Sequence, residues 1–372
     1  MVIKSLELNN FRNYSQLKLD FHEYSNILYG DNAQGKTNIL ESVFLCTTTK
    51  SHRSHKDKEM IKIGTDESHI RIIMEKNSIL HKIDMHLKLG KSKGVAIDGI
   101  PIKKSSELLG IAHVIFFSPE DLSIIKNGPA ERRRFINMEL SQMDKLYLHD
   151  LTEYNKVLAN RNQLLKQMKN NAELSKTLDV WDEQLIKYGT SLIEKRQKFI
   201  DELMDVVHRM HYKLSGRKEE LSMHYEANTL CSEFGHKLAL SRERDLAFAT
   251  THVGPHRDDL KFVIKDVDIR KYGSQGQQRT CALSLKLAEI ELVKNILHEN
   301  PILLLDDVLS ELDRNRQNYL LDNISGIQSM ITCTGLEEFI NGKLTLNRIY
   351  RVVEGTVHLE KEDTENEYRS NE

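Results

Sequence analysis

The sequence has few cysteines and prolines, and each scarcity excludes a class of protein. Neighbouring cysteines lie at least 50 residues apart, which excludes CxxC redox and zinc motifs and does not suggest a disulfide framework. The four cysteines are Cys46, Cys231, Cys281 and Cys333. With five prolines in 372 residues, no linker rich in proline, serine and glycine is visible. This cysteine usage favours a cytoplasmic location.

Long apolar runs and an excess of one charge are also missing. No apolar run approaches about 18 residues, which excludes a membrane-spanning helix, so we expect no membrane partner. Charged residues among the first twenty argue against a secretory signal peptide. The chain has 53 Lys+Arg and 55 Asp+Glu, a formal net charge of −2. This balance excludes a uniformly basic protein but allows local basic patches. At about 150 residues per domain, the length predicts roughly two domains.

The first hundred residues have the pattern of β structure around one helix. A short apolar run over residues 25–29 ends at a glycine, and a helix-compatible stretch follows over 36–46. Residues 69–76 and 79–89 are predicted strands. Asp98-Gly99 predicts a β-hairpin turn.

The middle of the chain, from about 120 to 215, changes to helical periodicity. Apolar residues recur there every three or four positions, which predicts long amphipathic helices packed as a hairpin or bundle. Core packing is the simplest interpretation, and a coiled-coil partner surface is the alternative. The first stripe contains Leu151, Tyr154, Leu158, Leu165 and Met168. The second contains Leu178, Trp181, Leu185, Tyr188, Leu192 and Phe199.

After about residue 250, strand and helix patterns alternate again. We predict strands over 261–265, 302–305, 329–332 and 348–353, and a long, nearly all-round apolar helix over 277–297. The chain is therefore an α/β protein with an inserted helical lobe.

A complete phosphate-binding motif, GxxxxGK[ST], follows the first apolar strand and precedes a helix. Its glycines let the backbone N–H groups point at phosphate oxygens, and the helix adds the positive end of its dipole. Lys36 would reach the β- and γ-phosphates of ATP, and the Thr37 hydroxyl would ligate Mg²⁺. The motif consists of Gly30, Asp31, Asn32, Ala33, Gln34, Gly35, Lys36 and Thr37.

A second motif ends the apolar strand at 302–305 with Asp306 and Asp307. Four successive apolar residues predict a strand buried on both faces of a parallel sheet. An acid at the carboxyl end of such a strand lies where open α/β sheets bind ligands. Asp306 would hold Mg²⁺, and Asp307 would orient or deprotonate the attacking water.

Small and amide side chains before the long helix make a second candidate phosphate contact. Ser274, Gly276 and Gln277 stand at a helix start, where backbone N–H groups bind anions. Because the chain already has one phosphate loop, a second is useful if it caps the nucleotide of another subunit. Residues 310–313 (SELD) would then lie at the same interface.

This order of motifs resembles the ABC-type P-loop ATPase head, with the SQGQ stretch at the signature position and SELD at the D-loop position. More closely, it resembles the RecF family of bacterial recombination and gap-repair proteins, related to SMC heads. The motifs that carry this resemblance run in order from near residue 3 to about 335. They are 9–14 NNFRNY, 30–37 GDNAQGKT, 117–121 FSPED, 132–134 RRR, 254–259 GPHRDD, 273–279 GSQGQQR and 306–307 DD.

The resemblance implies a weak, DNA-stimulated ATPase that forms a homodimer with two ATP molecules between its subunits. It also implies binding to gapped or single-strand/double-strand junction DNA, and work with RecO and RecR to load RecA. The implied domains are 1–118 with the P-loop, 119–250 as a helical lobe, 251–359 with signature, acidic strand and D-loop, and 360–372 as a frayed acidic tail.

Three departures from the general ABC pattern predict slow hydrolysis. No histidine follows the predicted strand over 329–332, and Thr334 stands near that switch position. No glutamine occurs between residues 105 and 140, where the Mg²⁺-sensing glutamine is expected. Asp307 replaces the usual glutamate and is one methylene shorter.

Several basic clusters are candidates for DNA contact despite the neutral total charge. The densest follows the P-loop helix, and two smaller ones contain Arg132–Arg134 and Arg242 with Arg244. A solvated or internally paired face is the alternative for each. Without interleaved aromatics, backbone contact is favoured over base stacking. The dense run contains Lys50, His52, Arg53, His55, Lys56 and Lys58.

Two further candidates are weaker. His252 and His256 have helical metal-pair spacing, but Gly254 and Pro255 between them break a helix. We therefore favour a loop near the nucleotide or dimer interface. Arg12 could lie against the adenine, because related heads have an early arginine there.

Two other function classes compete with an ATP-gated DNA-binding protein. A transporter ATPase subunit would be expected to have a shorter span between its motifs, a switch histidine and a membrane partner. A helical scaffold with purely structural ATP would show no turnover. The rate of phosphate release with and without DNA distinguishes the scaffold from the leading interpretation.

Overall fold

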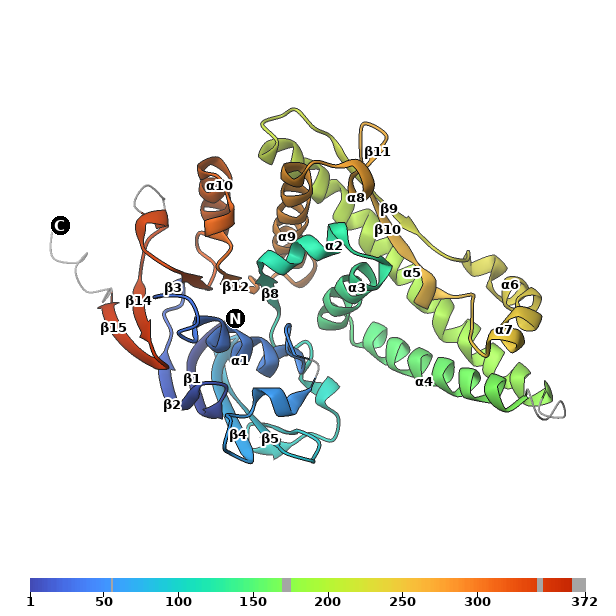
Figure 1. Cartoon of the computed structure of the whole chain (residues 1–372), viewed down its shortest axis with the longest axis horizontal. Helices are drawn as coiled ribbons and strands as arrows, with labels where there is room; N and C mark the ends of the chain where they lie inside the picture. The colour runs from blue at the N-terminus through green and yellow to red at the C-terminus, as the bar shows by residue number, and fades with distance from the viewer. Residues whose placement is uncertain (55, 169–174, 340–343, 363–372) are drawn as a thin grey trace. The chain divides into compact units, whose positions relative to one another are not determined.

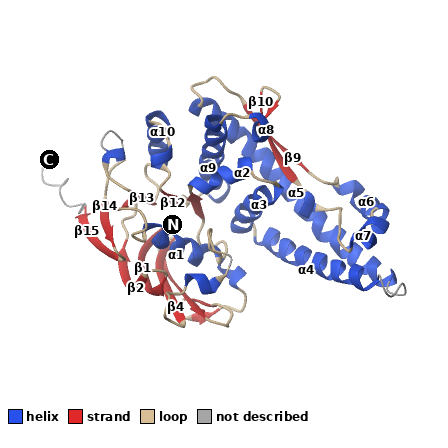
Figure 2. Cartoon of the chain, in the orientation of Figure 1, coloured by secondary structure: helices blue, strands red, loops and turns tan. Residues whose placement is uncertain are grey.

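The computed structural model describes residues 1–54, 56–168, 175–339 and 344–362 (Figure 1). Its contacts divide the chain into two compact units. The first combines Met1–Pro119 with Glu289–Glu372, and the second is Glu120–Ala288. A sheet-rich unit built from both ends of the chain and a mainly helical insertion confirm the predicted fold class (Figure 2). Residues 251–288 cluster with the helices, so their assignment to the ATPase lobe stays a prediction.

The first unit contains two six-stranded sheets and two of the α-helices. Its strands are β1 (Val2–Phe11), β2 (Tyr14–Asp20), β3 (Ser25–Tyr29), β4 (Glu67–Lys76), β5 (Ile79–Lys88), β6 (Gly94–Ile97), β7 (Ile100–Pro101), β8 (Val114–Phe117), β12 (Ile302–Asp306), β13 (Ser329–Cys333), β14 (Arg348–Val353) and β15 (Thr356–Glu362). Its helices are α1 (Lys36–Thr48) and α10 (Arg314–Ile324).

The second unit is built mainly from helices around a three-stranded sheet. Its helices are α2 (Leu122–Lys126), α3 (Pro129–Met143), α4 (Lys145–Met168), α5 (Ser175–Leu214), α6 (Phe234–Leu240), α7 (Arg242–Phe248) and α8 (Ile269–Tyr272). Its strands are β9 (Leu221–Glu226), β10 (Asp259–Ile264) and β11 (Val267–Asp268). Helix α9 (Gln275–Leu297) begins in this unit and ends in the first.

The sheet that matters for the site has the order β15-β14-β3-β13-β12-β8. Strands β3, β13, β12 and β8 pair in parallel, so their carboxyl ends meet at one edge. Strands β8, β12 and β13 are buried along their whole length, as expected for the mainly apolar central strands of a parallel sheet. The P-loop strand and the acidic strand are therefore not adjacent, because β13 lies between them.

The other sheet of the first unit is antiparallel, in the order β2-β1-β4-β5-β6-β7. The predicted hairpin joins β6 to β7, with Ile97 opposite Ile100. Asp98 and Gly99 both have positive φ, 53° and 81°, as a tight hairpin turn of this type demands. The hairpin prediction is confirmed.

In the second unit α4 packs along α5, and most of the predicted α5 stripe is buried. Leu178, Leu185 and Leu192 are each at most 2% exposed, so core packing explains this stripe. The α4 stripe is only partly correct, because Leu151 and Leu158 are half-buried while the charged Arg161 is fully buried. Helical periodicity found the helices, but it could not identify a buried arginine.

Other boundaries differ slightly from the predictions. Five strands have no counterpart among the predicted strands, namely β1, β8, β9, β11 and β15. Strand β15 continues to Glu362, so residues 360–362 are not a frayed tail, and residues 363–372 lie outside the described part of the chain. Among the described residues, no helix is both long and apolar enough to cross a membrane.

Candidate functional site

The phosphate loop needs both of its glycines for steric reasons. Gly30 has φ 148°, and a Cβ there would lie 2.3 Å from the carbonyl oxygen of Val352 in β14. Gly35 has φ 112°, and a Cβ there would lie 2.5 Å from Nδ2 of Asn13. Only glycine combines this backbone conformation with such close neighbours.

The loop is also held from outside by residues that precede it and follow it in the chain. Asn13 donates from Nδ2 to the carbonyl of Gln34 at 3.1 Å and accepts from Asn38 at 2.8 Å. The backbone N–H of Gly355 donates to the same Gln34 carbonyl at 3.2 Å. The motif at residues 9–14 contains Asn13, but the sequence alone does not indicate this supporting role.

Lys36 opens helix α1 and is 3% exposed. Its Nζ donates to the carbonyl oxygens of Gly30 and Asp31 at 2.6 and 2.9 Å, so the ammonium lies within the curve of the loop. The helix dipole adds positive potential at the same point. Such an arrangement of positive charge suits the phosphates of a nucleotide.

The two predicted Mg²⁺ ligands are in direct contact although 269 positions separate them in the chain. The Thr37 hydroxyl donates to Oδ1 of Asp306 at 2.8 Å. Thr332, next to Asp306 in the parallel register of β13, donates to the same oxygen at 2.8 Å. Thr332 was not predicted. Its signal is a hydroxyl near the carboxyl end of a fully buried strand, directly after Met330 and Ile331.

Asp306 is 9% exposed, and its environment alters its acidity. Burial raises the pKa of Asp306 and the charge of Asp307 adds to the rise, while hydrogen bonds from Thr37 and Thr332 and the charge of Arg53 oppose it. A desolvated carboxylate of this kind gains from a divalent cation beside it. The residues therefore fit a Mg²⁺ site made by Thr37 and Asp306.

Asp307 follows in an unusual backbone conformation, with φ 50°. Its N–H donates to the Thr332 hydroxyl at 2.9 Å, and its carbonyl accepts from Ser310 of the SELD segment at 2.7 Å. Asp313 of that segment accepts from the N–H of Arg316 and so caps helix α10. The main chain at Asp307 is thus fixed from two sides. Thr334, at the expected switch position, is exposed.

The signature residues belong to the second unit, and within it they form a reciprocal helix cap. Gln277 donates its backbone N–H to the Ser274 hydroxyl oxygen at 3.2 Å, and Oε1 of Gln277 accepts from the Ser274 N–H at 2.9 Å. This is a capping box at the start of α9. Ser274 and Gly276 are exposed. Their predicted role at a nucleotide stays a prediction.

Arg12 is engaged within the first unit. Its guanidinium donates to both carboxylate oxygens of Glu41 at 2.8 and 2.7 Å, and to Ser54. Burial alone would raise the pKa of Glu41, but the hydrogen bonds from Arg12 and Ser51 outweigh it and lower that pKa. A contact between Arg12 and adenine stays a prediction, and such a contact would have to form while Arg12 remains paired with Glu41.

The dense basic run is less uniform than its sequence suggests. His52 stacks on Phe116, with ring centroids 4.0 Å apart, and so faces the core. The positive charge of Arg53 acts to lower the pKa of Asp306. His55 lies outside the described residues. The exposed cations of the run are Lys50, Arg53, Lys56 and Lys58.

The two smaller clusters are partly structural, as the alternative interpretation proposed. Arg132 is 1% exposed and forms an ion pair with Asp259 at 2.5 Å, so it is not available to DNA. Arg133 donates to the carbonyl of Asp258 at 2.7 Å. Arg242 pairs with Asp182 at 2.7 Å.

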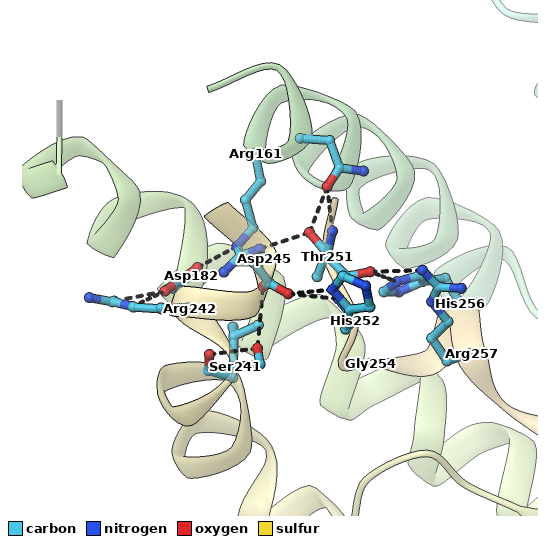
Figure 3. A network of polar contacts seen from close by, with 12 residues as sticks. Arg161, Asp182, Ser241, Arg242, Asp245, Thr251, His252, Gly254, His256 and Arg257 are labelled. Carbon is cyan, nitrogen blue, oxygen red and sulfur yellow. Dashed lines mark hydrogen bonds and ion pairs between the residues drawn. The ribbon is translucent and has the colours of Figure 1, made fainter. Parts of the chain in front are cut away.

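The loop with His252 and His256 belongs to a polar network of the second unit, shown in Figure 3. His252 contacts Asp245 at 2.8 Å, and His256 contacts the Tyr154 hydroxyl at 2.7 Å. Within the described residues, no group of three or more His, Cys, Asp and Glu side chains could hold a metal ion, so this histidine pair is not part of such a cluster. The contacts within this unit do not support the predicted position of this loop near a nucleotide.

Comparison with known sequences gives consistent results over nearly the whole chain. The family model described as "RecF/RecN/SMC N terminal domain" matches residues 2–358. The DNA replication and repair protein RecF of Lachnoclostridium phytofermentans is 63% identical over 357 residues, covering 96% of this chain and 99% of that protein. The corresponding protein of Agathobacter rectalis is 56% identical over 359 residues, with the same coverage.

Solved structures agree with the sequence comparison. A structure of the recombination mediator protein RecF with ATP, of the RecFOR pathway, has a TM-score of 0.90 and 36% identity and covers 96% of this chain and 97% of its own. An SMC head bound to the C-terminal winged-helix domain of ScpA has a TM-score of 0.57 and 14% identity and covers 97% of both chains. The second likeness concerns the fold alone.

Proposed function

This chain belongs to the RecF family of DNA replication and repair proteins, with the fold of ABC-type ATPase heads, and from that premise we propose how it works. ATP joins two copies into a homodimer with two nucleotides at the interface. The dimer binds gapped or single-strand/double-strand junction DNA and, with RecO and RecR, assists the loading of RecA. Hydrolysis is slow, is stimulated by DNA and resets the dimer.

The observation that supports this proposal best is the contact of Thr37 with Asp306 at 2.8 Å. Two residues from distant motifs meet at the end of the phosphate loop, where a bound Mg²⁺ would supply positive charge to neutralise the phosphates of ATP. Thr37 and Asp306 would hold the ion, and the backbone of residues 30–37 with Lys36 would hold the phosphates.

Asp307 would act on the attacking water. Its backbone is fixed by Thr332 and Ser310, which limits the reach of a side chain one methylene shorter than glutamate. A base that cannot approach closely transfers a proton less efficiently. This geometry favours slow turnover and a long-lived ATP-bound state.

Dimerisation by ATP requires contacts that exist only in the dimer. ATP can drive association only through extra affinity for the dimer over the monomer. The phosphate loop contacts ATP in both the monomer and the dimer, so it adds nothing to this extra affinity. The additional contacts would come from the signature residues of the opposite subunit, which are Ser274, Gly276 and Gln277. With two sites per dimer, even ~2 kcal/mol at each gives ~4 kcal/mol, roughly a thousandfold in the dimer constant.

DNA binding would use the exposed cations of the dense run. Lys50, Arg53, Lys56 and Lys58 lack interleaved aromatics, which suits contact with phosphates. If all four meet phosphates, replacing them by glutamine should flatten the slope of log K against log salt by roughly 3–4 units. An unchanged slope would place the DNA site elsewhere.

The relatives support the choice of partners. The solved RecF proteins are assigned to a RecFOR pathway, which suggests RecO and RecR as the proteins this chain works with. Pull-down of RecR by the full-length chain, with and without ATP, tests that part directly. Absence of binding under both conditions would contradict it.

The central experiment measures the mass of the full-length protein by light scattering with and without ATP. Ser274→Arg should block the close approach of the signature turn, leaving a monomer that still binds ATP. Because Arg also removes the α9 cap, Ser274→Asp provides a variant that keeps a capping oxygen and repels the γ-phosphate. Normal dimerisation of both variants would refute the sandwich. Loss of ATP binding would place Ser274 in its own subunit's pocket.

A further inference from the structure

We infer that Glu219 is a positioning residue for the signature segment, which fixes the orientation of the Gln277 side-chain amide and thereby that of Ser274. Glu219 lies in the connection between α5 and β9. Its Oε1 accepts from Nε2 of Gln277 at 2.8 Å. The inference rests on the proposed function, in which Ser274 contacts the nucleotide of a second copy.

The argument begins with the two ends of an amide. Oε1 of Gln277 accepts from the Ser274 N–H at 2.9 Å, which only the carbonyl end can do. Rotating the amide by 180° would turn its NH₂ toward that N–H, and the side-chain half of the reciprocal cap would be lost. The two orientations have nearly the same shape, so packing alone distinguishes them weakly.

The carboxylate of Glu219 removes this ambiguity. An ionised carboxylate accepts hydrogen bonds and donates none, so it requires the NH₂ end of Gln277 to face it. The carbonyl end is then directed to the Ser274 N–H. A charged acceptor at 2.8 Å therefore selects the capping orientation.

The backbone of Gln277 directs the Ser274 hydroxyl, while the side-chain amide holds the Ser274 main chain that carries it. The hydroxyl oxygen accepts from the backbone N–H of Gln277 at 3.2 Å, so its hydrogen points away from the helix. Ser274 is exposed. The hydroxyl is thus oriented as a donor toward solvent, which is the arrangement needed to bind a phosphate oxygen of an approaching subunit.

Glu219 is itself held in place from α5. Its Oε2 lies 3.4 Å from Nε2 of His211, whose side chain is fully buried. Nδ1 of the same imidazole lies 3.2 Å from the Ser284 hydroxyl on α9. The C-terminal end of the long helix α5 is thereby connected to the signature helix at two points, Ser284 and Gln277.

The size of the effect follows from the fraction of molecules with the correct amide orientation. An N-terminal cap contributes about a factor of five to an equilibrium constant. If losing Glu219 lowers the competent fraction by this factor, the apparent affinity falls in proportion. Because the dimer contains two copies of the contact, its association constant should fall roughly 25-fold.

The test is a cycle of variants measured by light scattering in ATP. Glu219→Gln removes the acceptor-only group and should weaken dimerisation. Gln277→Glu places two carboxylates together and should also weaken it. In the double variant the introduced amide donates to the introduced carboxylate, whose second oxygen accepts from Ser274. Dimerisation should return to within about threefold of the wild type, although the contact between His211 and a carboxylate at 219 remains lost.

Glu220→Gln is the matched control, since Glu220 is the exposed neighbour with the same charge. It should dimerise normally, and all variants should bind ATP as monomers with unchanged affinity. Normal dimerisation of Glu219→Gln, or a double variant as weak as the single ones, would overturn the inference. Ser274→Arg, measured in parallel, distinguishes a failure of the proposed ATP sandwich from a failure of the role of Glu219. If it dimerises normally the sandwich itself fails, whereas if it alone fails to dimerise only the role of Glu219 is refuted.

Discussion

The phosphate-loop site and the network around Arg161 both gather charged residues from distant parts of the chain, but they do so differently. In the site, main-chain carbonyls hold Lys36 and two hydroxyls hold Asp306. Among the described residues no ion pair joins either group to a side chain of opposite charge, although the charge of Arg53 acts to lower the pKa of Asp306. In the network, Arg161 is fully buried and donates to the carboxylates of Asp182 and Asp245 (Figure 3). One region can still receive a charged ligand, and the other has balanced its charges internally.

This difference teaches how to interpret charged motifs. The GPHRDD segment is part of the family resemblance, yet Asp258 accepts from Arg196 at 2.9 Å and Asp259 pairs with Arg132. Both carboxylates are therefore neutralised by arginines that are at most 2% exposed, and they are not available to a ligand. Paired buried charge maintains a fold, whereas buried charge held only by neutral groups indicates a ligand.

Removing a network arginine should have the largest effect. Arg161→Met leaves Asp182 and Asp245 as buried carboxylates with fewer partners, which should lower the free energy of unfolding by about 3–5 kcal/mol. The only tryptophan of the sequence, Trp181, packs against Leu164, Leu165 and Leu178 in the same unit. Its fluorescence during urea unfolding therefore reports on this region.

The control for Arg161 is Arg242→Met in the same network. The Arg242 side chain is 36% exposed, so its ion pairs with Asp179 and Asp182 are screened by water. We expect a loss of at most about 1 kcal/mol. Equal losses for the two variants would mean that burial does not distinguish these arginines.

The second prediction concerns acid. Burial lowers the pKa of His256 to about 4 in the folded protein. In the unfolded chain the pKa of this histidine is about 6.5, so the unfolded chain binds the proton more readily below that pH. Stability from the neutral ring is therefore present at neutral pH and is lost as pH falls from about 6.5 to 4. The loss should be on the order of 3 kcal/mol, and Trp181 fluorescence should detect it.

His256→Gln should remove this part of the pH dependence, while His236→Gln, at an exposed position, should retain it. Parallel pH profiles for the wild type and His256→Gln would contradict the assignment. Such a result would transfer the acid sensitivity to another group in the unit.

In the site, Asp307→Asn should change chemistry and not stability. An amide cannot accept a proton from water, so turnover should fall by about a hundredfold or more while ATP binding persists. ATP-bound dimers should accumulate, as measured by light scattering and phosphate release. Asp322→Asn, on the exposed face of α10, is the control. Wild-type turnover in Asp307→Asn would require a different base.

Apart from the control variants, Lys36→Arg should have the smallest effect of these substitutions. The guanidinium keeps the charge but is planar and too bulky for the curve of the loop, so ATP affinity should fall at least about tenfold. Circular dichroism should be unchanged, because the described hydrogen bonds of the ammonium are to main-chain carbonyls, which a guanidinium can also contact. Lys103→Arg, exposed in the same unit, should bind ATP normally. Normal ATP binding by Lys36→Arg would remove Lys36 from the site.

The sequence predicted the local parts of the site well. Strand β3 has the predicted bounds, and α1 begins at the predicted residue. Such elements depend on neighbours within a few positions, where periodicity and glycine placement are visible. The supporting residues Asn13 and Thr332 were missed, because their hydrogen bonds depend on strand order. The sequence left open whether Arg132 contacts DNA or pairs internally, because composition does not reveal burial.

The sequence by itself determined the phosphate loop, the acidic strand and the alternation of sheet and helix, since each follows from short-range sterics and burial pattern. Only the tertiary structure decided that β13 lies between the two motif strands and supplies Thr332 to both acids. The tertiary structure also decided which charged side chains are paired inside the protein. Arg161 and Lys36 are both buried cations, and only the carboxylates folded against one of them distinguish a structural ion pair from a binding site.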